Sequence, residues 1–158
     1  MTAPAAWALR LAGLNALVNA AGFGAFDVLA TWHFARDHEV WYALENPTYG
    51  YGPFYDHGLD TTVPLLLAFL GACVVLATGG GLLLALRPVG VVTTLAGIVI
   101  CAPFWWGFDL PFAWINAATL LVLLSLGRTA QVPARTIRTC SPSSCSSSVP
   151  SRRKPWRS

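Results

Sequence analysis

Apolar residues in this chain occur in long runs, and the charged residues lie between the runs. The clearest run covers residues 63–86 without a charged side chain. At about 1.5 Å per residue it is long enough to cross about 30 Å of hydrocarbon. Another uncharged run, residues 89–106, follows directly after Arg87 and Pro88. Because proline cannot continue the hydrogen bonding of the preceding helix, these two runs predict a tight hairpin of membrane-spanning helices.

Two further runs complete a pattern of four spans. The last run covers residues 111–127 and starts at Pro111, a residue suited to a first helical turn. The first run, residues 7–29, is weaker because Asn15, Asn19 and several small residues dilute its hydrophobicity. A cleaved signal peptide is the alternative interpretation of this run, since Arg10 precedes a modest apolar stretch with small residues. We expect a retained membrane helix, because the apolar character continues to residue 29.

The composition supports a membrane fold. Of the 158 residues, 55% are hydrophobic and only 11% are charged, against roughly 25% charged in an ordinary soluble domain. The sequence therefore predicts an all-α integral membrane protein, in which residues 1–127 form a bundle of four transmembrane helices. After residue 127 the composition changes to Ser, Pro, Arg and Thr, so residues 128–158 are predicted to be a disordered cytoplasmic tail.

Charge placement predicts the orientation. All seven acidic residues fall on one side of the four-span arrangement, and nine of the ten basic residues, all except Arg36, fall on the other. Short loops rich in Lys and Arg stay in the cytoplasm. Both termini are therefore predicted to be cytoplasmic, in a multi-pass protein of the plasma membrane that the Arg- and Ala-rich composition assigns to a bacterial inner membrane. The basic excess lies beside a span, which favours anionic lipid over nucleic acid as the partner of the tail.

The predicted outer loop, residues 30–62, is dense in aromatic and acidic residues and contains all three histidines. We expect an ordered cap over the bundle, with a short amphipathic helix over residues 31–44 that ends before Asn46 and Pro47. The loop also offers candidate ligands for a divalent ion. Their spacing matches no metal-binding motif, so neither a metal nor a cofactor is predicted. These candidates are His33, Asp37, His38, Asp56 and His57.

Small and polar residues recur every three or four positions along the first run and so share one helix face. Small side chains let membrane helices approach closely, and Asn amides can hydrogen-bond between them, so helix packing is the favoured interpretation. The alternative is a polar cavity in which Asn116 joins Asn19 or Asp27. The residues of this face are Ala12, Asn15, Ala16, Asn19, Ala20, Phe23, Gly24 and Asp27.

No catalytic motif occurs in the sequence. The four cysteines are spread over two runs and the tail, which argues against a membrane thiol oxidoreductase with a redox-active cysteine pair. A lipid-acting enzyme with a His-Asp pair is a minor hypothesis. The leading hypothesis is a non-enzymatic interaction or assembly protein, with a membrane-protein partner or a second copy of itself in the bilayer. The rival hypothesis is binding or transport of a small molecule or ion in a polar pocket between the loop and the bundle. That pocket would use Asn15, Asn19, Asp27, His33, Asp37, His38, His57 and Asn116.

Overall fold

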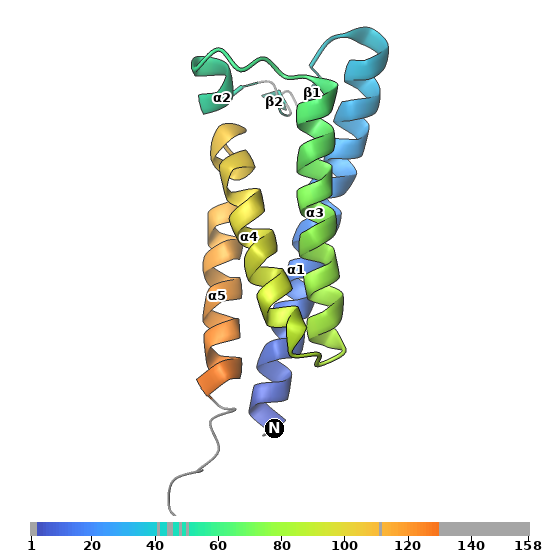
Figure 1. Ribbon diagram of the computed structural model, residues 1–158. Coiled ribbons are helices and arrows are strands. Elements are labelled where there is room, and N and C mark those ends of the chain that lie inside the picture. Colours follow the sequence, from blue (N-terminus) through green and yellow to red (C-terminus); the bar gives the residue numbers. More distant parts are fainter. Residues whose placement is uncertain are drawn as a thin grey trace, which may run out of the picture.

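The computed structural model describes residues 3–40, 42–43, 46–47, 49, 51–110 and 112–129. Four long helices run lengthwise through the molecule (Figure 1): α1 (Ala3–Asp37), α3 (Val63–Leu84), α4 (Val89–Gly107) and α5 (Ala113–Thr129). Between α1 and α3 lie the short helix α2 (Pro53–Asp56) and two-residue strands, β1 (Tyr42–Ala43) and β2 (Asn46–Pro47), which pair antiparallel. The all-helical prediction is confirmed. The predicted tail, apart from residues 128 and 129, lies outside the described residues.

Three helices, α1, α3 and α4, are long and apolar enough to cross a membrane. The apolar part of α5, Ala113–Gly127, is shorter. Within the part of the chain that the structure describes, the exposed hydroxyl groups of these helices also suit an apolar solvent. Each donates a hydrogen bond to the carbonyl four residues earlier, which leaves no free donor towards lipid. These groups belong to Thr78, Thr93, Thr119 and Ser125.

The first helix is longer than predicted. It continues through residues 30–37, which were expected to belong to the outer loop and to start a separate amphipathic helix. No proline or glycine interrupts this stretch, and side chains one turn apart support it. Arg36 lies over the ring of Trp32 at 5.5 Å, and His33 pairs with Asp37 at 3.6 Å. The helix ends where His38 adopts a left-handed backbone conformation with φ of 56°.

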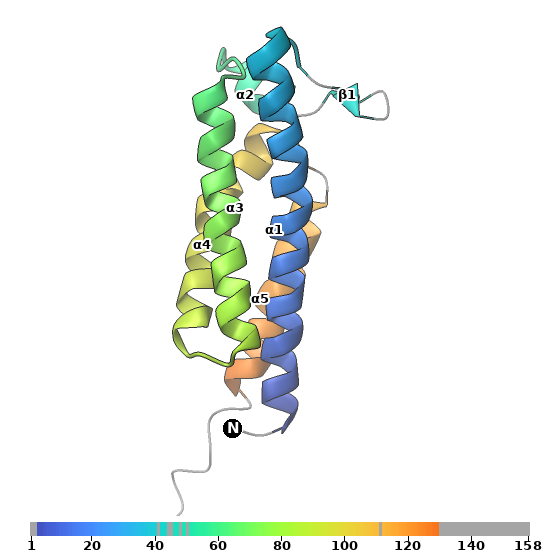
Figure 2. The same cartoon turned by 90° about the vertical axis from the view of Figure 1, so that its right-hand side faces the viewer.

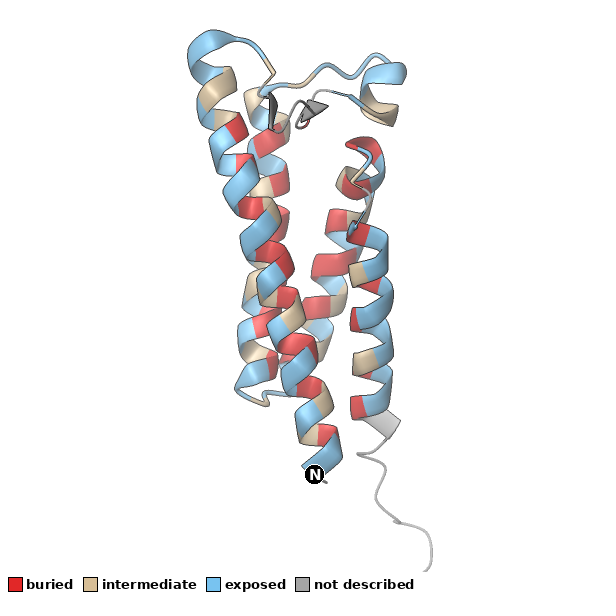
Figure 3. Cartoon of the chain, turned by 180° about the vertical axis from the view of Figure 1, so that it is seen from behind, coloured by how far each residue is buried: buried red, intermediate tan, exposed pale blue. Residues whose placement is uncertain are grey.

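The long helices pack in the order α4, α3, α1, α5. Figure 2 shows α3 beside α1, with α4 next to α3 and α5 behind α1. α1 lies along α3, α4 lies along the other side of α3, and α5 packs on α1 while barely touching α4. Buried positions lie on the inward faces of the helices and exposed positions on the outward faces (Figure 3). Helix α5 is therefore held mainly by α1.

Glycines bring the backbones of α1, α3 and α4 into contact. A Cβ on Gly13 would lie 2.7 Å from the carbonyl oxygen of Gly80, and one on Gly97 would lie 2.8 Å from the Cα of Leu76. Ala12, with the other alanines of the predicted stripe, is buried. Gly13 and Gly97 thus serve packing within the chain, whereas a Cβ on Gly22, Gly71 or Gly81 would meet nothing within 4 Å.

Candidate functional site

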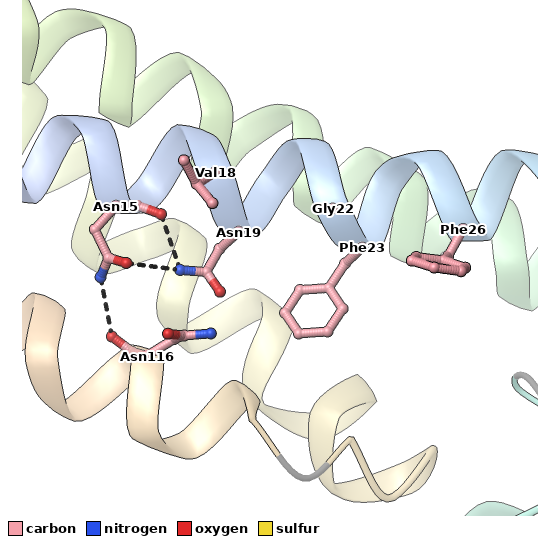
Figure 4. A pocket seen from close by; sticks show the side chains of 7 residues that line it. All are labelled: Asn15, Val18, Asn19, Gly22, Phe23, Phe26 and Asn116. Atoms are coloured by element: carbon pink, nitrogen blue, oxygen red, sulfur yellow. Dashed lines mark hydrogen bonds between the residues drawn. The ribbon is translucent and has the colours of Figure 1, made fainter.

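Three asparagines meet between α1 and α5. The side-chain amide of Asn15 donates to the backbone carbonyl of Asn116 at 3.3 Å. The amide of Asn19 donates to the backbone carbonyl of Asn15 at 2.8 Å and lies 3.2 Å from the side-chain oxygen of Asn15. Asn15 and Asn19 lie one helical turn apart, so both face α5. The network links the middle of α1 to the first turn of α5, where Asn116 lies (Figure 4).

The network forms one wall of a cavity of about 240 Å³. Most of the remaining wall is apolar, with the rings of Phe23 and Phe26 beside the asparagines (Figure 4). Val18 and Phe26 are 63% and 48% exposed, so the cavity opens on the outer surface of the bundle. Its lining residues are Asn15, Val18, Asn19, Gly22, Phe23, Phe26 and Asn116.

The cavity offers a hydrogen-bonding group that the protein itself does not use. The backbone carbonyl of Asn116 accepts from Asn15, but its side-chain amide makes no hydrogen bond to a described residue. That amide carries two donors and one acceptor. A ligand in this cavity would therefore meet mainly apolar walls and a few amide groups.

Asp27 lies apart from this cavity. Its side chain is fully buried, and its carboxylate oxygens make no hydrogen bond to a described residue. The carboxylate lies near Tyr49 and Cys73. The predicted combination of Asp27 with Asn116 is thus not formed, because Asp27 faces α3 and the loop while Asn116 is on α5.

Tyr49 inserts into the bundle from the segment between α1 and α3. Its side chain is 4% exposed, and its hydroxyl donates to the carbonyl of Phe23 at 3.1 Å. The ring packs edge-on against Phe69 and Phe108, with centroid separations of 5.7 and 5.0 Å. Burial raises the pKa of the Tyr49 phenol well above its ordinary value, and the nearby Asp27 adds to this effect. Phe23 therefore connects the inserted tyrosine to the cavity wall.

The loop residues of the predicted pocket lie elsewhere. His33 and Asp37 pair with each other on the last turns of α1, where Asp37 also lies 3.5 Å from Arg36. His38 packs edge-on against Phe34. The Nδ1 atom of His57 lies 2.7 Å from the carbonyl oxygen of Pro53. Among the described residues, no group of three His, Cys, Asp or Glu side chains could hold a metal ion.

Sequence reasoning identified the three asparagines and placed Phe23 on the same face as Asn15 and Asn19, but it missed Val18, Gly22 and Phe26. Nothing in the sequence around Gly22 and Phe26 indicates that they line a cavity, because this depends on how α5 packs against α1. It also missed that Cys73 of α3 and Cys101 of α4 are neighbours across the hairpin. The chain matches no known family model, characterised protein or solved structure. Inferences about its function therefore rest on the geometry of the chain itself.

Proposed function

We propose that this protein crosses a bacterial plasma membrane four times and binds a small amphiphilic molecule in the cavity between α1 and α5. The observation that carries the proposal is a cavity of about 240 Å³ with apolar walls and an unused Asn116 amide. A single ring or a short piece of acyl chain, with one hydrogen-bonding group, is the matching class of ligand.

The proposed topology is supported by the ends of the helices. The N-terminus, the connection between α3 and α4, and the end of α5 lie together at one end of the bundle (Figure 1). Arg87 lies in that connection, and Arg128 lies in the last turn of α5. At about 1.5 Å per residue, the 17 residues of α5 extend about 25 Å, close to the thickness of the hydrocarbon core. The positive-inside rule then assigns this end to the cytoplasm.

The binding hypothesis is better supported than the assembly hypothesis. Assembly was expected from the abundance of small residues, which membrane helices use for mutual contact. Within the described helices, however, Gly13 and Gly80 are in contact with each other, and Gly97 is in contact with Leu76. These three glycines are therefore used for packing within one chain, although a Cβ on Gly71 or Gly81 would meet nothing within 4 Å. The cavity, in contrast, contains the side-chain amide of Asn116, which makes no hydrogen bond to a described residue.

Native mass spectrometry of the purified protein tests the binding proposal. Gly22 lines the cavity, and a Cβ at this position would meet nothing within 4 Å, so Gly22→Leu fills space that a ligand would need. Gly71 on α3 also has open space around it but is far from the lining residues in the chain, so Gly71→Leu is the matched control. We expect the wild type and Gly71→Leu to carry an added small-molecule mass that Gly22→Leu lacks.

Two results would contradict the proposal. One is a wild-type protein that carries no added mass after extraction in mild detergent and reconstitution with membrane lipid extract. The other is an added mass that Gly22→Leu retains at the wild-type level. An Asn116→Leu variant then reports on the polar contact, since losing one hydrogen bond to a ligand costs about 0.5–1.5 kcal/mol. We expect its occupancy to fall between those of the wild type and Gly22→Leu.

A further inference from the structure

The hairpin of α3 and α4 has a regular register that brings its two cysteines together. Going up from the connection, Gly90 lies against Leu83, Thr94 against Gly79, and Gly97 against Leu76. Further along, the rings of Phe69 and Phe104 stack at 5.3 Å between centroids. In each pair the two residue numbers add to the same value, so the register does not slip. Cys73 and Cys101, whose numbers add to one more than this value, lie between the last two pairs.

The thiols of these two cysteines are adjacent. The thiols of Cys73 and Cys101 are near enough to influence each other electrostatically, and both are free in the structure. In the neighbouring layer the backbones of α3 and α4 approach closely, because a Cβ on Gly97 would lie 2.8 Å from the Cα of Leu76. Helices that approach so closely can bring cysteine Cα atoms into the range of about 4.4–6.8 Å that a disulfide needs.

The burial of the two thiols limits which oxidants can reach their sulfur atoms. Cys73 is 3% exposed and Cys101 is fully buried, and both lie inside helices that are candidate membrane spans. A charged or bulky oxidant, such as glutathione disulfide or the disulfide of another protein, has no route to these sulfur atoms. A small uncharged oxidant can diffuse through hydrocarbon and through transient openings between helices.

We propose that Cys73 and Cys101 form a dithiol site that hydrogen peroxide, a small uncharged oxidant, converts into a disulfide linking α3 to α4. One thiol sulfur attacks a peroxide oxygen, the O–O bond breaks, and a sulfenic acid and one water form. The second thiol then attacks the sulfenic sulfur, the S–O bond breaks, and a second water leaves as the S–S bond forms. Two thiols are oxidised to one disulfide while one peroxide is reduced to two waters.

The test uses the full chain with Cys140→Ser and Cys145→Ser, so that Cys73 and Cys101 are the remaining thiols. The protein, reconstituted in lipid nanodiscs, is exposed to hydrogen peroxide, unfolded in SDS and treated with a maleimide. We expect loss of both alkylation sites, an intact mass lower by two hydrogen atoms, and recovery of both sites after reduction. The oxidised protein should remain a monomer on a non-reducing gel, since the bond is within one chain.

Two single-serine variants and a second oxidant serve as controls for this experiment. Cys73→Ser and Cys101→Ser variants should each show no loss of two hydrogen atoms, because a single thiol cannot close the bond. Glutathione disulfide should leave both thiols of the folded protein free, yet oxidise them after unfolding in SDS. The proposal is overturned if both thiols are still alkylated after peroxide treatment, or if the product is a disulfide between two chains. Equal oxidation of the folded protein by glutathione disulfide would overturn the assignment of the oxidant.

Discussion

Two glycines of helix α3 differ in their surroundings: Gly79 is in close contact with α4, and Gly71 faces open space. A Cβ on Gly79 would lie 2.6 Å from the backbone nitrogen of Thr94 and 2.8 Å from its Cα, so α4 would have to move. A Cβ on Gly71 would meet nothing within 4 Å. In a helix interior alanine is more favourable than glycine by about 0.5–1 kcal/mol. The effect of the same substitution at these two positions is therefore expected to have opposite signs.

We predict that Gly79→Ala destabilises the protein by about 1–3 kcal/mol, the typical cost of overpacking. Gly71→Ala should be neutral or stabilising by up to about 1 kcal/mol, since it only removes backbone freedom. Unfolding by SDS titration from mixed micelles, followed by circular dichroism, measures both values. Equal stability of the two variants would show that the close approach of α3 and α4 is not formed.

The buried phenol of Tyr49 predicts a dependence on alkaline pH. Its pKa is raised on folding, so the neutral form is favoured in the folded state. The associated stability is present below the pKa of the unfolded chain, about 10, and is lost as the pH rises through the folded-state pKa. Tyr51 and Tyr55 are exposed, so they are suitable positions for control substitutions.

We predict that Tyr49→Phe costs about 0.5–1.5 kcal/mol near neutral pH through loss of the hydrogen bond to Phe23. This cost should shrink above about pH 10, where the wild type begins to lose the contribution of the neutral phenol. Thermal unfolding of both proteins between neutral and strongly alkaline pH gives the difference. A difference that stays constant over this range, or that Tyr55→Phe reproduces, would contradict burial of Tyr49.

At the scale of elements, the segment between α1 and α3 is tied to the helix ends at a few points. The hydroxyl of Thr61 donates to the carbonyl of Tyr49, and Tyr49 reaches Phe23. Phe54 of α2 packs edge-on against Phe108, with centroids 5.3 Å apart, and lies directly over Gly107. These contacts favour the proposal of an ordered cap. Residues 41, 44, 45, 48 and 50 of the predicted cap lie outside the described residues.

We predict that Phe54→Ala loosens this cap, because it removes the ring contacts with Phe108 and with the end of α4. A loss of about 1.4 kcal/mol in the free energy of local opening raises the cleavage rate about tenfold when opening and closing are fast relative to cleavage. Limited proteolysis from the outside of spheroplasts measures this rate. Tyr55→Ala, at an exposed position on the same short helix, should leave the rate nearly unchanged. Rapid cleavage of the wild type would refute the cap.

At the scale of the whole molecule, the four long helices differ greatly in length. The 35 residues of α1 extend about 52 Å, well beyond the hydrocarbon core, whereas α5 has 17 residues. The last turns of α1 carry the charged residues Arg36 and Asp37, which suit water or lipid headgroups. Since α5 is held mainly by α1, the cavity between them depends on how these unequal helices lie in the bilayer.

We predict that both termini and the connection at Pro88 face the cytoplasm, while His38 and Asp109 face outwards. A variant without native cysteines receives single cysteines, which are labelled with a membrane-impermeant maleimide. Sites 38 and 109 should react on intact cells, and sites 88 and 144 only after permeabilisation, since short basic segments stay inside. Labelling of site 144 on intact cells would invert the topology. The single-cysteine variants are His38→Cys, Pro88→Cys, Asp109→Cys and Ser144→Cys.

The sequence by itself determined the helices, because membrane solvation demands long apolar runs and these are visible without tertiary information. It predicted the bounds of the long helices to within a few residues, except at the end of α1, where local side-chain pairs extend the helix to Asp37. It also identified Asn15 and Asn19 as facing a neighbour, since a spacing of four residues places them on one helix face.

Only the tertiary structure decided which neighbour each face meets. The asparagine face meets α5, so Asn116 joins it, whereas Asp27 turns towards α3 and the inserted Tyr49. Likewise Cys73 and Cys101 meet only because glycines fix the register of the hairpin. Periodicity fixes the direction of a side chain relative to its own helix, but contacts between helices depend on crossing geometry and register. Those are set by packing among residues far apart in the sequence.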